Sequence, residues 1–116
     1  MVIIDDDDQT LRLATLILTS HGFAVEAYRN PAAALAAVSA RRPGAVVLDL
    51  VMPVMNGMEA AYEISRIAPN AKIVFISSHY TPEQTTAMAR LFGADFVQKS
   101  EVAKELIPTI NRLLDV

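Results

Sequence analysis

The stretch that decides the fold is AVVLDL at Ala45–Leu50, in which apolar residues surround a single carboxylate at Asp49. A run that is apolar on both of its faces is typical of a central parallel strand covered by helices on both sides. Four further apolar runs predict strands, and they lie at Val2–Ile4, Phe23–Tyr28, Lys72–Ile76 and Ala94–Gln98.

Helical patterns separate these five runs from one another. Asn30 and Pro31 form an N-cap with a proline at the first helical position, and Thr81 and Ser100 are further predicted N-caps. Glycine and proline mark the predicted helix ends, which lie at His21-Gly22, Pro43-Gly44, Pro69-Asn70 and Gly93.

Strands that alternate with helical crossovers predict a parallel sheet with helices on both faces. Five such units are too few for an eight-stranded barrel, so we expect a doubly wound open α/β sheet. The functional site of such a sheet lies outside the carboxyl ends of its strands. Because the 116 residues contain neither a linker nor a repeat, we expect one domain over residues 1–116.

Composition excludes several classes of function. The chain has no cysteine, which rules out disulfides, thiolate nucleophiles and cysteine-ligated metals. Its net charge of −3 speaks against a nucleic-acid-binding face. The start MVII runs into four aspartates, which is unlike a secretory signal, and no apolar stretch approaches the ~18 residues that span a bilayer. We therefore expect a cytoplasmic protein that binds neither nucleic acid nor membrane.

Five polar side chains are predicted to meet at one edge of the sheet. Asp5 and Asp6 follow the first strand, Asp49 lies near the end of the third, and Ser77 and Lys99 follow the fourth and fifth. Carboxylates about 4 Å apart repel each other by about 4 kcal/mol at an effective dielectric of 20, so the cluster needs a cation. Oxygen ligands without nearby histidine or cysteine favour Mg²⁺.

This combination of groups suits phosphoryl transfer. A divalent cation, a lysine and a hydroxyl can neutralise charge on the phosphoryl oxygens. Asp49 can be the nucleophile, because carboxylates form acyl-phosphate intermediates.

Four motifs in order resemble the receiver domain of the response regulators of two-component signalling, over essentially the whole chain. They are IIDD at Ile3–Asp6, DLVMPVMNG at Asp49–Gly57, Ile76-Ser77, and GADFVQK at Gly93–Lys99. The resemblance implies a flavodoxin-like (βα)5 fold with strand order 2-1-3-4-5, the order of the chemotaxis member of that family.

The resemblance also implies a role for each residue that matches a motif. Asp49 would be the phosphoacceptor and would take its phosphoryl group from a sensor histidine kinase or a phosphotransfer protein. Asp6, Asp49 and the main-chain carbonyl of Val51 would hold Mg²⁺ directly, and Asp5 would act largely through water. Lys99 would pair with Asp49 before phosphorylation and with the phosphate afterwards.

A conformational switch is implied as well. Ser77 would move towards the phosphoryl oxygens, and Phe96 would swing inward behind it. The face formed by the predicted helix that ends at Gly93, the strand Ala94–Gln98 and the helix that follows Ser100 would then control an output partner, an attached domain or a phosphorylation-dependent homodimer. Such a domain is not an enzyme beyond catalysing its own phosphorylation and dephosphorylation.

Three alternatives remain at the level of sequence. The acidic run also allows a register one residue along, with Asp6-Asp7 in place of Asp5-Asp6. A Mg²⁺-dependent hydrolase with an aspartyl-phosphate intermediate usually has a second aspartate two residues after the nucleophile, and Val51 occupies that place. A receiver-like module that binds partners without phosphorylation is the third. One departure from the family is Ser100, where proline is more common after the lysine.

Overall fold

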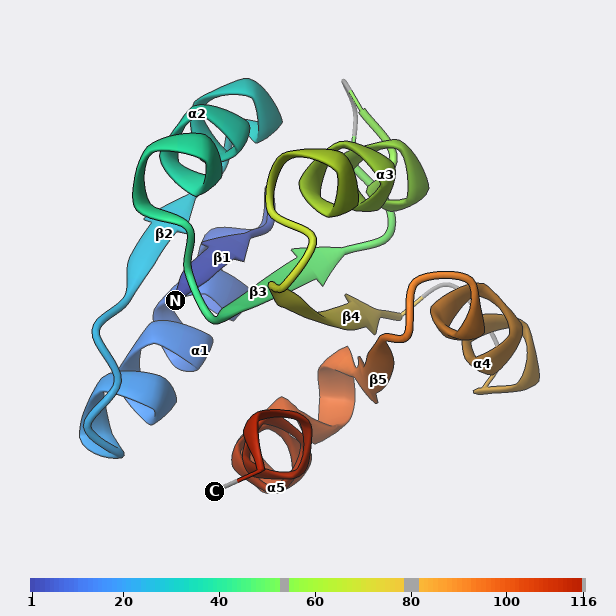
Figure 1. Cartoon of the computed structure of the whole chain (residues 1–116). Coiled ribbons are helices and arrows are strands. Elements are labelled where there is room, and N and C mark those ends of the chain that lie inside the picture. The colour runs from blue at the N-terminus through green and yellow to red at the C-terminus, as the bar shows by residue number, and fades with distance from the viewer. Residues whose placement is uncertain (53–54, 79–81, 116) are drawn as a thin grey trace.

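A computed structural model describes residues 1–52, 55–78 and 82–115, with the side chains of residues 82, 85, 88 and 89 left aside. Five parallel strands form one sheet in the order β2-β1-β3-β4-β5, with helices on both faces (Figure 1). The doubly wound fold and its strand order are therefore confirmed. The strands are β1 (Val2–Ile4), β2 (Glu26–Tyr28), β3 (Ala45–Asp49), β4 (Lys72–Ser77) and β5 (Asp95–Gln98), and the helices are α1 (Asp8–Ser20), α2 (Pro31–Arg41), α3 (Gly57–Ile67), α4 (Pro82–Arg90) and α5 (Val102–Leu114).

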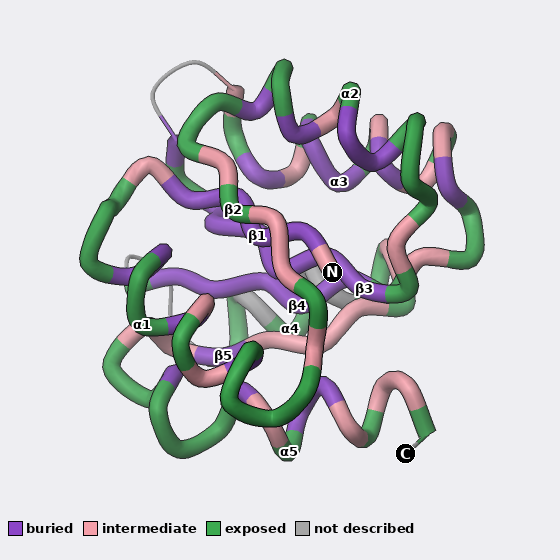
Figure 2. The backbone as a smooth tube through the Cα atoms, turned by 90° about the vertical axis from the view of Figure 1, so that its left-hand side faces the viewer, coloured by how far each residue is buried: buried purple, intermediate pink, exposed green. Residues whose placement is uncertain are grey.

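The central strand β3 is buried along its whole length, as its sequence predicts. Successive side chains of a strand point to opposite faces, so Val46 and Leu48 pack under α2 and α3, whereas Ala45 and Val47 pack against α1 and α5. Figure 2 shows buried residues concentrated along the strands and on the inner sides of the helices. Two apolar layers thus hold the sheet rigidly between helices, and its carboxyl edge carries the polar residues.

Helix α4 lies beside the edge strand β5 (Figure 1). The Phe92 ring, which follows this helix, meets Phe75 of β4 edge to face, with ring centroids 6.1 Å apart. On the other side of β5, Arg112 of α5 donates to the Asp95 carboxylate through Nε and Nη2 at 3.2 and 2.5 Å. Side-chain contacts therefore join the segment after α4 to β4, and α5 to the edge strand β5.

Two predicted elements differ from the structure. β2 begins at Glu26 rather than Phe23, because its neighbour β1 offers only Val2–Ile4 for pairing. Ser100 does not cap α5: residues 99–101 form a 3₁₀ turn, and the Val102 amide donates to the carbonyl of Lys99. The turn supplies the hydrogen bonding that a cap residue would otherwise provide. Thr81, the predicted cap of α4, lies outside the described residues.

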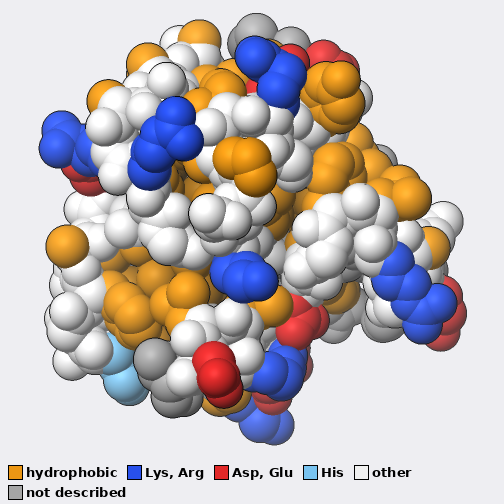
Figure 3. Space-filling model, in the orientation of Figure 1, with side chains coloured by type: hydrophobic (Ala, Val, Ile, Leu, Met, Phe, Trp, Pro, Cys, Tyr) orange, Lys and Arg blue, Asp and Glu red, His pale blue; other side chains and the backbone are white. Residues whose placement is uncertain are grey.

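Hydrophobic side chains on the face shown in Figure 3 are interspersed with charged ones. Within the described residues, no helix combines the length and the apolar character needed to cross a bilayer.

Candidate functional site

Three carboxylates meet at the carboxyl ends of the two central strands. Asp5 directly follows β1 and Asp49 is the last residue of β3, and these strands pair in parallel with Ile4 opposite Leu48. One oxygen from each of Asp5, Asp6 and Asp49 lies within 4.8 Å of the others. Asp5 and Asp49 are almost completely buried, so their charges are poorly screened by water.

Lys99 reaches this acidic group from β5, at the far edge of the sheet. Its Nζ lies 3.2 Å from Oδ2 of Asp5 and 3.4 Å from Oδ2 of Asp49, and its side chain is only 17% exposed. Although partial burial opposes the charged form, the two carboxylates raise the pKa of Lys99. The structure thus places an ammonium group beside both acids. Sequence reasoning anticipated the contact with Asp49 but not the shorter one with Asp5.

The surroundings of the Asp5 carboxylate strongly disfavour its charged form. Burial raises its pKa to about 7, and the nearby Asp49 carboxylate adds to the rise, while the Asp7 amide and Lys99 oppose it. Oδ1 accepts a hydrogen bond from the Asp7 amide at 2.9 Å. Oδ2 accepts no hydrogen bond from any residue that the structure describes, although the Lys99 ammonium lies nearby. A buried anionic oxygen of this kind is a candidate ligand for a cation.

The rest of the acidic run serves the start of α1. Asp7 is the N-cap, and its carboxylate accepts from the Gln9 amide at 3.1 Å and from Thr10 Oγ1 at 2.8 Å. These hydrogen bonds lower the pKa of Asp7. Asp8 lies in the first turn and pairs with Arg29 at 3.3 Å. The geometry therefore brings together Asp5 and Asp6 with Asp49, whereas Asp7 belongs to the helix cap.

The loop after β3 is held close to the Asp49 backbone. Oδ1 of Asp49 accepts from the Val51 amide at 3.2 Å, and the Gly57 amide donates to the Leu50 carbonyl at 2.9 Å. A Cβ on Gly57 would lie 2.5 Å from Cα of Leu50 and 2.6 Å from the Asp49 carbonyl oxygen. Only glycine fits there. The sequence held no signal of this close approach.

The two predicted switch residues lie on neighbouring strands. Ser77 ends β4, is fully buried and pairs in register with Gln98, the residue before Lys99. Phe96 pairs with Phe75 and packs, half-buried, against the apolar layer under α2 and α3. Ser77 is thus at the carboxyl edge with the acids, whereas Phe96 lies further back along its strand.

The acidic group fits a hard divalent cation. Its donors are carboxylate oxygens, and the described residues place no histidine nitrogen among them. Among the described residues, the buried Oδ2 of Asp5 accepts no hydrogen bond, and the Lys99 ammonium lies 3.2 Å from it. Oxygen donors of this kind suit Mg²⁺ or Ca²⁺ better than Zn²⁺.

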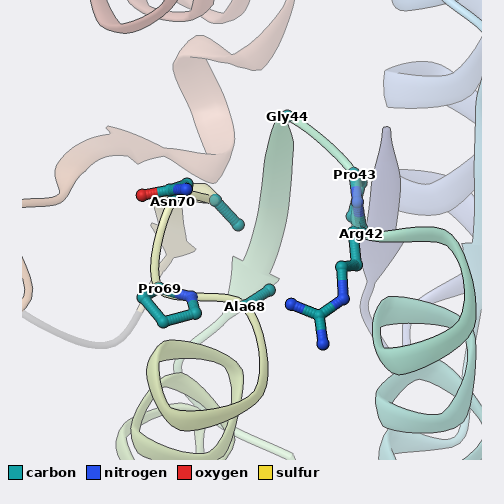
Figure 4. Close-up of a pocket in the computed structure, with 7 residues that line it drawn as sticks. Arg42, Pro43, Gly44, Ala68, Pro69 and Asn70 are labelled. Carbon is teal, nitrogen blue, oxygen red and sulfur yellow. The ribbon is translucent and has the colours of Figure 1, made fainter.

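A separate cavity lies at the opposite edge of the sheet (Figure 4). It measures about 220 Å³ and lies between the loop before β3, at Arg42–Gly44, and the loop before β4, at Ala68–Ala71. The residues that line it include no carboxylate, and the Arg42 side chain extends into it. This cavity therefore has none of the acidic chemistry found at the carboxyl edge.

Comparison with known proteins agrees with this arrangement. Residues 1–111 match the model of the response regulator receiver domain. The nitrogen assimilation regulatory protein NtrX of Azorhizobium caulinodans is 30% identical over 99% of this chain, and the transcriptional regulatory protein FixJ of Rhizobium meliloti is 28% identical over 95%. The chain spans only 26% and 54% of these two relatives.

Solved structures show the same likeness. The receiver domain of NtrX from Brucella abortus superposes with a TM-score of 0.89 at 30% identity, covering 99% of this chain and 98% of that one. A CheY-like receiver domain from Methanospirillum hungatei gives a TM-score of 0.88 at 24% identity, covering 98% and 91%. With its sheet order, its acidic edge and a family match over nearly all of its length, the chain belongs to the receiver domain family of two-component response regulators.

Proposed function

We propose that this receiver domain accepts a phosphoryl group on Asp49 from a phosphohistidine of a partner kinase or phosphotransfer protein. The observation that carries the proposal is the contact between the buried Asp49 carboxylate, two further aspartates and the Lys99 ammonium at one edge of the sheet. The attacking carboxylate oxygen forms a bond to phosphorus while the bond from phosphorus to the imidazole nitrogen breaks. The imidazole leaves with the electron pair.

Asp5, Asp6 and Asp49, with the main-chain carbonyl of Val51, are the groups that would hold Mg²⁺. The ion would supply charge neutralisation for the phosphoryl oxygens and for the acids themselves. Support comes from the three carboxylates, which each have an oxygen within 4.8 Å of the others. The buried Oδ2 of Asp5, which accepts no hydrogen bond from the described residues, is further support.

Lys99 is the protein's own cation for the phosphoryl group. Its ammonium already contacts the Asp49 carboxylate at 3.4 Å, so it can transfer that contact to a phosphoryl oxygen without a large movement. The Ser77 hydroxyl lies at the end of the adjacent strand and can donate to a second phosphoryl oxygen. Phosphorylation adds about −1.5 to −2 charges, which these new contacts would offset.

Ser77 and Phe96 form the proposed switch. Phosphorylation draws the Ser77 hydroxyl towards the new oxygens, and the space behind it favours the inward position of Phe96. Ser77 is buried and Phe96 is only half-buried, so the aromatic ring has room to exchange between two positions. The face formed by α4, β5 and α5 would change with them and reach an output partner, an attached domain or a second copy.

Acetyl phosphate with Mg²⁺, followed by intact-mass measurement, tests the assignment. The native chain is expected to gain one phosphoryl group, and Asp49→Asn is expected to gain none. Asp115→Asn, which changes an exposed aspartate at the end of α5, is the matched control and is expected to behave as the native chain. An adduct on Asp49→Asn, or its absence from the native chain with several phosphodonors, would contradict the proposal.

A further inference from the structure

A groove between α2 and α3 plays no part in the proposed phosphorylation. These two helices lie side by side over one face of the sheet (Figure 1). The groove measures about 570 Å³. Its lining consists of four side chains with apolar bodies and two acids, namely Leu35, Met55, Met58, Tyr62, Glu59 and Glu63.

The floor of the groove is apolar and partly open to water. Leu35, Met55 and Met58 pack on the core layer beneath but stay only partly buried. Tyr62 is 63% exposed, so most of its ring is available to a partner at the rim of the groove. Met58 and Tyr62 are four residues apart on α3 and so share one side of that helix. Methionine side chains adapt readily to the shape of a partner.

The charge at the groove is acidic. Glu59 and Glu63 are its only charged lining residues in the described part of the chain. Glu59 Oε1 accepts from Asn56 at 2.8 Å, and Glu63 pairs with Arg66 at 2.6 Å in a contact open to solvent. The exposed Glu63–Arg66 ion pair contributes about 0–1 kcal/mol, so a partner's cation can replace Arg66 at little cost.

We propose that this groove binds a basic amphipathic helix of a partner protein. Apolar side chains one turn apart on that helix would enter the floor between Leu35 and the Met58–Tyr62 row. Its flanking lysines or arginines would meet Glu59 and Glu63. Amphipathic helices that dock into grooves insert apolar side chains that lie about one helical turn apart. The interaction goes beyond the phosphoacceptor function and requires no phosphoryl group on Asp49.

Two labelled peptides test the proposal on the full chain. Both carry leucines one helical turn apart, and they differ only in having lysine or glutamate on the opposite face. We expect the lysine peptide to bind and to shift backbone NMR signals of residues 55–63 and Leu35. The glutamate peptide is expected to bind at least tenfold more weakly. Added salt is expected to lower the affinity of the lysine peptide.

Substitutions assign any binding to the groove. Tyr62→Ala should lower the affinity for the lysine peptide about tenfold. Glu59→Gln, which can still accept a hydrogen bond from Asn56, should lower this affinity several-fold. Leu16→Ala removes a side chain of similar exposure, 64%, from α1 on the opposite face and should leave the affinity unchanged. Thermal unfolding of each variant, expected to match the native chain, separates lost docking from lost folding.

Three outcomes would overturn the proposal. One is that the lysine peptide does not bind, and another is that Tyr62→Ala and Leu16→Ala weaken it equally. The third is concentration-dependent dimerisation of the free chain that Tyr62→Ala abolishes, because the occupant would then be a second copy. Asp49→Asn should bind the lysine peptide as the native chain does, so a failed phosphorylation test leaves this one intact.

Discussion

Asp5 shows what a single residue contributes to the site and what it costs the fold. Its carboxylate is fully buried beside Asp49, and the contact with Lys99 offsets only part of the resulting penalty. Burying this acid at the edge of the sheet therefore lowers the stability of the protein when no cation is bound. A cation that binds the folded state would recover that stability by mass action.

The pH dependence of unfolding follows from this burial. The pKa of Asp5 is about 7 in the folded protein against 3.8 for an ordinary aspartate. Between these values the folded state holds a proton that the unfolded chain has released. The free energy of unfolding should therefore fall as pH rises from about 4 to about 7, by up to roughly 1.4 kcal/mol per pH unit, and level off above.

Urea titrations in EDTA between pH 5 and 8 measure this effect. Asp5→Asn removes the titrating group and should show a shallower decline than the native chain. Asp8→Asn, which changes an exposed acid of the same run, should keep the native decline. Equal slopes for the native chain and Asp5→Asn would show that Asp5 titrates normally. Millimolar Mg²⁺ should raise the native stability more at pH 8 than at pH 5.5, because protons compete for the same carboxylate.

At the scale of elements, the turn from β3 into α3 connects Asp49 to a helix. Gly57 lies so close to Leu50 and Asp49 that an added Cβ would overlap their backbone atoms. Gly57→Ala should destabilise the fold by about 1–3 kcal/mol, the usual cost of overpacking. It should also weaken Mg²⁺ binding, because the Asp49 backbone has to shift.

Gly44→Ala is the matched control for that substitution. Gly44 precedes β3 at its other end, and a Cβ there would make only an ordinary contact, 3.9 Å from Leu114. Denaturant midpoints and Mg²⁺ titrations of the two variants should therefore separate clearly. A Gly57→Ala variant as stable as Gly44→Ala would mean that the turn has more room than the structure shows.

Elements and site residues differ in how well the sequence predicts them. AVVLDL predicts β3 because a strand buried on both faces has a continuous apolar sequence. The carboxyl ends of parallel strands lie at one edge of the sheet, and this places Asp5, Asp49 and Lys99 together. The sequence predicted β2 but not its late start at Glu26, since the length of β2 is set by the partner strand β1. The contact between Lys99 and Asp5 likewise depends on a side chain crossing the sheet edge past β4.

At the scale of the whole molecule, the strands β4 and β5 connect Asp49 to the helices α4 and α5 at the surface. Ser77 ends β4 and Lys99 directly follows β5, and β5 lies against α4 and is joined to α5 through Asp95 and Arg112. Helix α2 lies over the other half of the sheet, where it packs against β1 and β2. A conformational response to a charge added at Asp49 should therefore reach α4, β5 and α5 more strongly than α2.

A beryllofluoride mimic of the phosphoryl group, added with Mg²⁺, tests this direction. Backbone NMR signals should shift in residues 82–90, 95–98 and 102–114, whereas the outward side of α2 should stay nearly unchanged. Asp49→Asn should lose the shifts on α4, β5 and α5, because the mimic then has no carboxylate to bind. Shifts confined to the loops that follow β1 and β3 would contradict the switch, since they would show the ion and its mimic binding without any rearrangement of the distant face. The pairing of Arg112 with Asp95 provides a local readout, because a rotation of α5 against β5 has to lengthen or break it.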